Sequence, residues 1–168
     1  MRYRLGVVAP TVAEVVGCAG GWLFDRGMAG WQVTVIVGDH TGARALQILG
    51  ADVLDLEEAL AATTRRPDLD AVAITGEVFE SDQRIRCGVL EVLELGDSEL
   101  SVLGERCPSE LARHVDIMQH RLSFAAQAFK SQALAALGGS RTPVGALETF
   151  HTGAPVWAPP VDLVPVAG

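Results

Sequence analysis

Residues 5–37 read LGVVAPTVAEVVGCAGGWLFDRGMAGWQVTVIV, and this stretch decides the fold. Leu5–Ala9 is an apolar run without polar interruption, as expected of a parallel strand that is covered on both faces. Val33–Val37 is rich in β-branched residues, which also favour a strand. Between them, apolar residues recur at helical spacing, at Val12, Val15, Val16, Ala19 and Leu23. A strand, a helix and a second strand in this order favour parallel pairing through a right-handed crossover. The sequence therefore predicts an α/β fold.

The same alternation continues along the chain. Further strands are predicted at 52–56, 70–75, 100–103 and 114–118. Further helices are predicted at 43–49, 57–65 and 81–95, and from Gln119 to Leu137, with Ser81 as the N-cap of the 81–95 helix. We expect a Rossmann-like, doubly wound, mostly parallel sheet with helices on both faces.

The chain divides into one α/β domain at 1–152 and a proline-rich apolar tail at 153–168. The tail carries four prolines among its apolar side chains, so it can form neither a helix nor a central strand. Such a tail is expected to dock on its own domain or on a neighbouring subunit, because its apolar side chains are unfavourable in water. We favour docking on a second copy, which predicts a homo-oligomer.

Composition excludes several classes of partner. Thirteen Lys and Arg against 21 Asp and Glu give a net charge of -8, the wrong sign for a nucleic-acid partner. No apolar run approaches the roughly 20 residues needed to span a membrane. Glu14 interrupts the apolar N-terminal stretch and is unfavourable in a signal peptide. Three cysteines supply neither a disulfide framework nor a zinc cage, so we expect buried thiols and a cytoplasmic protein.

The order of these segments resembles the PIG-L/LmbE-type N-acetylglucosamine deacetylases, which use a divalent metal. The resemblance covers most of residues 5–150, in a chain shorter than typical members. The matching segments are Val8–Glu14, Gly17–Gly21, Gly30–Val37, Ala45–Leu56, Arg66–Val72, Glu80–Arg84, Gln119–Leu137 and Glu148–Phe150.

The resemblance also shows which functional side chains are missing. In the family the first strand ends in His-Pro-Asp-Asp, and a later motif reads His-Pro-Asp-His-Arg; together they supply the metal ligands, the base and the acid. The corresponding positions here are Ala9, Thr11, Val12, Glu80 and Gln83. A catalytic zinc site needs about three ligands and an open position. We therefore expect no metal, no cofactor and no deacetylase activity.

Other polar residues can still form a site at the strand ends, where α/β sheets bind ligands. The candidates for ligand binding are Thr11, Asp39, His40, Glu77, Glu80 and Arg84, and Glu80, Asp82 and His40 are the acid–base candidates if the chain is an enzyme. All of these candidates except Arg84 have a simpler explanation: a helix cap for Thr11, loop hydrogen bonds for Asp39, a solvated loop for His40, and a helix N-terminus for the acidic residues Glu77, Glu80 and Asp82.

Three functions remain open. The leading hypothesis is a non-catalytic protein that binds a small sugar-like or nucleotide-like ligand, or a partner protein, in the former active-site cleft. The second is a metal-independent enzyme that uses acid–base groups at the same cleft. The third is a structural homo-oligomer, which is compatible with the first.

Overall fold

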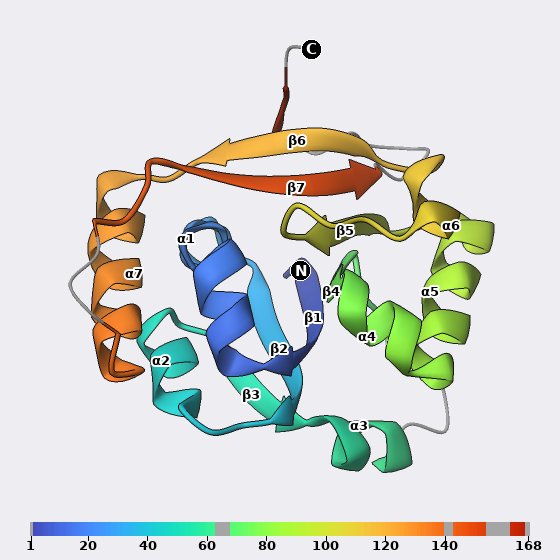
Figure 1. Cartoon of the computed structure of the whole chain (residues 1–168), viewed down its shortest axis with the longest axis horizontal. Coiled ribbons are helices and arrows are strands. Elements are labelled where there is room, and N and C mark those ends of the chain that lie inside the picture. Colours follow the sequence, from blue (N-terminus) through green and yellow to red (C-terminus); the bar gives the residue numbers. More distant parts are fainter. Residues whose placement is uncertain (1, 63–67, 140–142, 154–161, 167–168) are drawn as a thin grey trace.

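The computed structural model describes residues 2–62, 68–139, 143–153 and 162–166. These residues form one eight-stranded sheet flanked by helices (Figure 1). The strands are β1 (Arg4–Thr11), β2 (Gln32–Asp39), β3 (Asp52–Asp55), β4 (Ala71–Thr75), β5 (Glu99–Leu103), β6 (Asp116–Arg121), β7 (Leu147–Gly153) and β8 (Val164–Pro165). The helices are α1 (Val12–Met28), α2 (Ala43–Ile48), α3 (Leu56–Ala62), α4 (Gly76–Ser81), α5 (Gln83–Leu95), α6 (Ser109–Ala112) and α7 (Phe124–Ala136).

The strand order is β3-β2-β1-β4-β5-β7-β6-β8. The first five strands are parallel, and β7, β6 and β8 add an antiparallel edge. The prediction of an α/β fold with a mostly parallel sheet is confirmed. From β1 the chain moves outward to β2 and β3, and it then returns to place β4 on the other side of β1. This reversal puts the crevice typical of ligand sites at the ends of β1 and β4.

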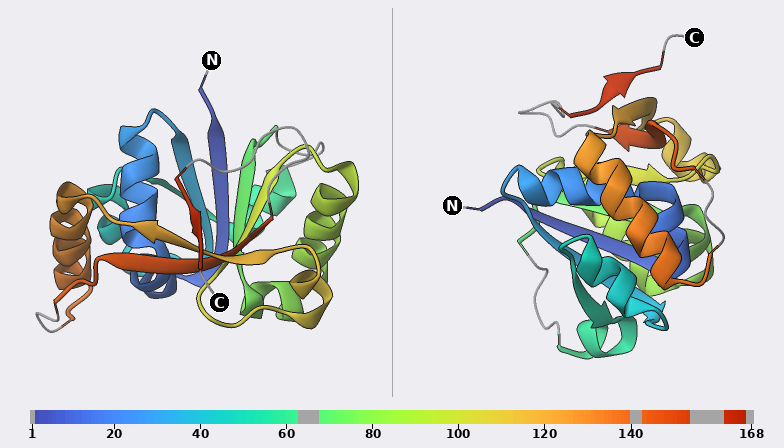
Figure 2. Two further views of the ribbon diagram at one scale, coloured as in Figure 1. Left: turned by 90° about the horizontal axis from the view of Figure 1, so that it is seen from above. Right: turned by 90° about the vertical axis from the view of Figure 1, so that its left-hand side faces the viewer.

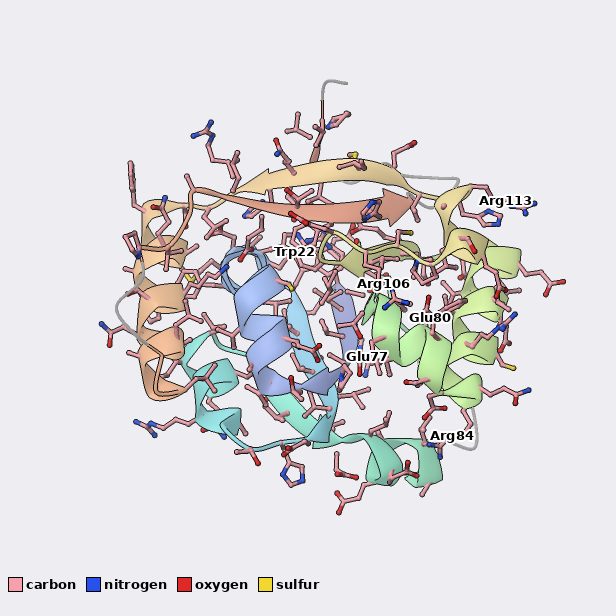
Figure 3. All side chains as sticks on the ribbon, viewed as in Figure 1. Trp22, Glu77, Glu80, Arg84, Arg106 and Arg113 are labelled. Carbon is pink, nitrogen blue, oxygen red and sulfur yellow. The ribbon has the colours of Figure 1, made fainter. Side chains whose placement is uncertain are left out.

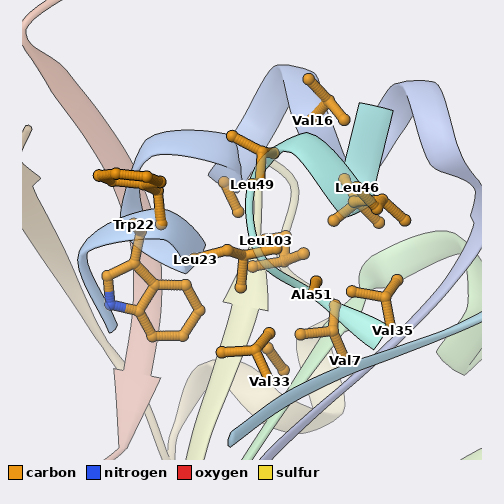
Figure 4. Close-up of a cluster of buried hydrophobic side chains, with 14 of the residues drawn as sticks. Val7, Val16, Trp22, Leu23, Val33, Val35, Leu46, Leu49, Ala51 and Leu103 are labelled. Carbon is orange, nitrogen blue, oxygen red and sulfur yellow. The ribbon is translucent and has the colours of Figure 1, made fainter. Parts of the chain in front are cut away.

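Helices cover both faces of the sheet. Figures 1 and 2 show α1, α2 and α7 on one face and α3, α4, α5 and α6 on the other. Side chains along β1 alternate between these faces: Leu5 and Val7 are buried in the larger hydrophobic cluster, whereas Val8 packs against the smaller one. In the larger cluster, Trp22 and Leu46 lie above the strand residues of β1 and β2 (Figure 4).

Glu148 of β7 reaches into the middle of α1. Its carboxylate accepts hydrogen bonds from the backbone N–H groups of Gly21 and Trp22, with N–O distances of 3.0 and 2.6 Å. Lys130 of α7 donates to the same carboxylate at 2.7 Å and to the carbonyl of Gly17 at 2.8 Å. A buried ion pair therefore joins α1, α7 and β7 at the glycine-rich part of α1.

This glycine-rich run packs closely against Leu122, against Lys130 of α7 and against Leu49 at the end of α2. A Cβ atom added to Gly21 would lie 2.1 Å from a methyl carbon of Leu122, and one added to Gly20 would lie 3.4 Å from Lys130. The closest contact of this run is with Leu122, in the segment that leads into α7.

Residues 162–166 pack on the rest of the same chain. Asp162 accepts hydrogen bonds from Arg26 and Trp22, and Leu163 is only 4% exposed in the larger hydrophobic cluster. Val164 and Pro165 form β8 at the edge of the sheet, where proline is tolerated. Residues 154–161 of the predicted tail lie outside the described residues, and binding of the tail to a second copy stays a prediction.

Three predicted elements need correction. The helix predicted at 81–95 begins at Gln83, because the carboxylate of Asp82, and not Ser81, accepts the capping hydrogen bonds from Arg84 and Ile85. Ser81 ends a separate helix, α4. The helix predicted from Gln119 begins at Phe124, because residues 119–121 complete β6.

The strand predicted at 114–118 is shifted to 116–121, and β7 was not predicted as a strand. The inward-facing residues of β7 include Glu148 and Thr152, so the strand lacks an apolar alternation. The hydroxyl group of Thr152 forms a buried hydrogen bond of 2.9 Å with the hydroxyl group of Ser101 in the neighbouring strand β5. The strand was therefore missed in the sequence, because its buried polar residues bind partners far away along the chain.

The three cysteines are free thiols. Cys18 and Cys107 are half-buried, and burial raises the pKa of both thiols. Cys87 is exposed on α5, so the prediction of buried thiols is wrong for this residue. Among the described residues, no helix is both long and apolar enough to cross a membrane.

Candidate functional site

The ends of β1 and β2 bring Thr11 and Asp39 side by side in the strand register. The hydroxyl of Thr11 caps α1 by accepting a hydrogen bond from the N–H of Glu14 at 3.3 Å, and it donates to the Glu14 carboxylate at 3.2 Å. On the other side of β1, Thr75 ends β4 and caps α4 through the N–H of Val78 at 3.2 Å. Two capped helices thus begin at the crevice between β1 and β4.

The resemblance predicts metal-ligand positions at Ala9, Val12 and Gln83. Ala9 and Val12 are fully buried in the larger hydrophobic cluster, with no exposed surface. Gln83, at the third such position, is an exposed amide at the first residue of α5, and Thr11, which the resemblance places at the position of the base, is a helix cap. Among the described residues, no three His, Cys, Asp or Glu side chains lie close enough together to hold a metal. This donor set does not fit a zinc ion.

Glu77 and Glu80 lie on α4, next to a basic residue that the sequence did not single out. Both carboxylates are exposed, and Arg106, from the loop after β5, forms an ion pair with Glu80. Figure 3 shows Glu77, Glu80 and Arg106 grouped around α4, with Glu77 toward α1. Within this group, the charge of Glu77 is not balanced by an ion pair with any described residue.

Arg84 lies apart from that group, beside α3 (Figure 3). Its guanidinium pairs with Glu57 at 2.7 Å and with Asp82 at 2.9 Å. Hydrogen bonds to Arg84 lower the pKa of both carboxyl groups, and hydrogen bonds to Glu57 and Asp82 raise the pKa of Arg84. Asp82 is therefore held ionised as a helix cap and an ion-pair partner, which does not suit it as a proton donor.

Asp39 and His40 lie in the loop after β2. Asp39 is exposed and accepts a hydrogen bond from the N–H of Thr41 at 2.9 Å; hydrogen bonds from Thr41 lower its pKa. His40 is 60% exposed, and its Nε2 lies 3.4 Å from a carboxylate oxygen of Asp55 at the end of β3. The loop hydrogen bond expected for Asp39 is present.

The structure therefore divides the predicted site into three groups. The first group is Thr11, Asp39 and His40, at the ends of β1 and β2. The second is Glu77 and Glu80, on α4. The third is Arg84, which connects α5 to α3. The sequence did not identify Glu14, Asp55 or Arg106 as neighbours of these groups. Glu14 carried a usable signal, because an acidic residue three positions after a threonine N-cap is typical of a capping pair.

The sequence matches no protein-family model and no curated protein. In fold it is similar to the crystal structure of the A40926 pseudoaglycone deacetylase Dbv21, with a TM-score of 0.61, 14% identity and 100% of each chain covered. A deacetylase–teicoplanin complex gives a TM-score of 0.59 at 10% identity over 89% of this chain and 98% of that one. The conserved protein TT1542 from Thermus thermophilus gives 0.51 at 19% identity, over 90% and 95%. This chain therefore has the fold of deacetylases of the PIG-L/LmbE type.

Proposed function

We propose that this chain is a non-catalytic protein with a deacetylase fold, which binds a small sugar-like ligand at the ends of β1, β2 and β4. The observation that carries the proposal is the state of Ala9 and Val12. The resemblance places both at positions of metal ligands in that family, and both side chains are fully buried hydrocarbon. A metal-activated water, which this type of hydrolysis needs, has no place to be held there.

The polar groups at these strand ends favour a neutral, hydroxyl-rich ligand over a nucleotide. Carboxylates of Glu14, Asp39, Asp55 and Glu77 lie on or beside the strand ends. Carboxylates accept hydrogen bonds from hydroxyl groups, whereas they repel phosphate. The net charge of -8 acts in the same direction.

The metal-independent enzyme has less support. A general acid and base must both reach one substrate. Glu80 is paired with Arg106, Asp82 is held ionised by Arg84, and His40 lies in the loop after β2 near Asp55. These contacts separate the three residues that such chemistry would use together. Homo-oligomerisation and binding of a partner protein stay predictions.

A titration of the full chain with N-acetylglucosamine and with its 6-phosphate tests this function. We expect amide NMR shifts around Thr11 and Glu77 with the neutral sugar, weaker binding of the phosphate, and no release of acetate. Glu77→Gln should weaken sugar binding, whereas Glu94→Gln, an exposed site on α5, should not. Acetate release, or tighter binding of the phosphate, contradicts the proposal.

A further inference from the structure

An apolar cavity lies between the sheet and the helices α3 and α5, on the face of the sheet that these helices cover. Its volume is about 190 Å³. The wall is formed by hydrocarbon side chains of the sheet and of the two helices, such as Ile36, Val72, Leu60 and Val89. An engineered protein cavity of about 150 Å³ with a similar apolar lining stays dry and binds benzene. This cavity is therefore large enough for one apolar group of that size.

Helix α5 keeps a glycine at the opening of this cavity. Gly88 lines it, and a Cβ atom added there would meet no atom within 4 Å. Glycine in a helix is about 1 kcal/mol less favourable than alanine. The chain therefore has a glycine at a position where alanine would fit without a clash and would favour the helix.

The charged groups at the opening select the sign of a ligand. Arg84 and Glu91 are the charged residues of the wall. Arg84 already donates hydrogen bonds to Glu57 and Asp82, so its charge is balanced within the protein. The Glu91 carboxylate is exposed and forms no ion pair or hydrogen bond with any residue that the structure describes. The opening therefore combines apolar space with a carboxylate that no described residue pairs.

We infer that this cavity binds a small lipophilic amine, with its hydrocarbon part against Val72 and Val89 and its ammonium group at Glu91. The apolar wall contributes by removing hydrocarbon surface from water. Glu91 contributes attraction for a cation and repulsion for an anion. This site lies on the sheet face under α3 and α5, away from the strand ends, so it does not depend on the function proposed for the strand ends.

Three ligands that share one ring test the inference: benzylamine, benzyl alcohol and benzoate. Each is titrated into the full ¹⁵N-labelled chain, and amide shifts are followed by NMR. We expect shifts on α3 and α5, with benzylamine bound most tightly and benzoate least tightly. Glu91→Gln should weaken benzylamine about two- to five-fold, the effect of one exposed ion pair, and leave benzyl alcohol unchanged.

Two further variants separate the cavity from the charge. Gly88→Leu should fill the opening and abolish binding of benzylamine and benzyl alcohol, whereas Glu94→Gln, on α5 but outside the wall, should change neither. If Gly88→Leu does not fold, the comparison of Glu91→Gln with Glu94→Gln still decides the role of the charge. The inference is overturned if benzoate binds as tightly as benzylamine. It is also overturned if folded Gly88→Leu retains binding, or if the shifts fall around Thr11 and Glu77.

Discussion

Buried Arg26 and half-buried Asp162 form an ion pair that holds the C-terminal segment against α1, with 2.6 Å between Nε and Oδ2. The guanidinium also stacks on the rings of Trp22 and Trp31, at 4.7 and 4.2 Å from their centroids. Its third interaction is an ion pair of 2.9 Å with Glu99 of β5. One side chain thus connects α1, the main sheet and the segment after residue 161.

Asp162→Asn should destabilise the fold, because Arg26 loses its closest carboxylate while it stays buried. Removal of one partner from a buried pair costs about 3 to 5 kcal/mol, and we expect the low end because Glu99 remains. Urea denaturation measures the change. Asp116→Asn, an exposed site on β6, is the control and should shift the unfolding free energy by less than about 0.5 kcal/mol. An unchanged midpoint for Asp162→Asn would show that the pair does not hold the segment.

Glu99 and Asp162 should respond to pH in opposite senses. Burial raises the pKa of Glu99, and the charge of Arg26 offsets this only in part. Burial also acts on Asp162, but hydrogen bonds and the charge of Arg26 outweigh it and lower its pKa. The Asp162 contribution is therefore lost as pH falls through its lowered pKa. Ionised Glu99 instead disfavours the folded state at neutral pH, and its protonation on acidification removes that cost.

Glu99→Gln tests this difference. Relative to the unmodified chain, the variant should be more stable at pH 7 than at pH 5, because the unmodified chain recovers stability when Glu99 takes up a proton. Urea denaturation of both proteins at pH 5, 6 and 7 gives the comparison. A difference in unfolding free energy that does not vary with pH would contradict the raised pKa of Glu99.

Two glycines in α1 should respond oppositely to alanine. Gly21→Ala places a methyl group 2.1 Å from Leu122, and overpacking of this kind costs about 1 to 3 kcal/mol. Gly17→Ala meets no atom within 4 Å and should stabilise the helix by up to about 1 kcal/mol. The measurement is the thermal unfolding midpoint of each of the two variants, compared with that of the unmodified chain. Equal effects would mean that Gly21 is not a point of close packing.

The tail contributes to stability through Leu163 and is available for assembly through Val164. Leu163→Ala should cost about 2 to 5 kcal/mol, because its side chain is buried in the larger cluster. Val164 is 64% exposed, so Val164→Ala should leave the unfolding of a monomer unchanged. Analytical ultracentrifugation of both variants tests the predicted homo-oligomer. If Val164→Ala leaves the sedimentation unchanged, Val164 has no part in assembly.

The first half of the fold was predictable because its strands are apolar runs and its helices have regular apolar spacing. Residues 5–9 and 33–37 pair in parallel as expected. The N-cap of α5 was mispredicted, because Ser81 and Asp82 are adjacent and both residue types are good N-caps. Strand β7 was missed because Glu148 is buried by Lys130 and by the backbone of α1, partners that no local pattern reveals.

The candidate site was predictable at the level of single residues near strand ends, but not as a constellation. Arg84 was grouped with Glu80 because the two are close in sequence, and its partner Glu57 lies 27 residues away. Arg106 was missed for the same reason, because its ion pair with Glu80 spans 26 residues. Such pairings depend on how α4, α5 and the loop after β5 are placed by the sheet.

The zinc content of the full chain tests the central claim most directly. The protein is expressed with added zinc, dialysed against a weak chelator, and analysed for metal. With Ala9 and Val12 buried and Gln83 exposed as an amide, we predict well below one zinc per chain. Close to one zinc per chain after dialysis would contradict the account.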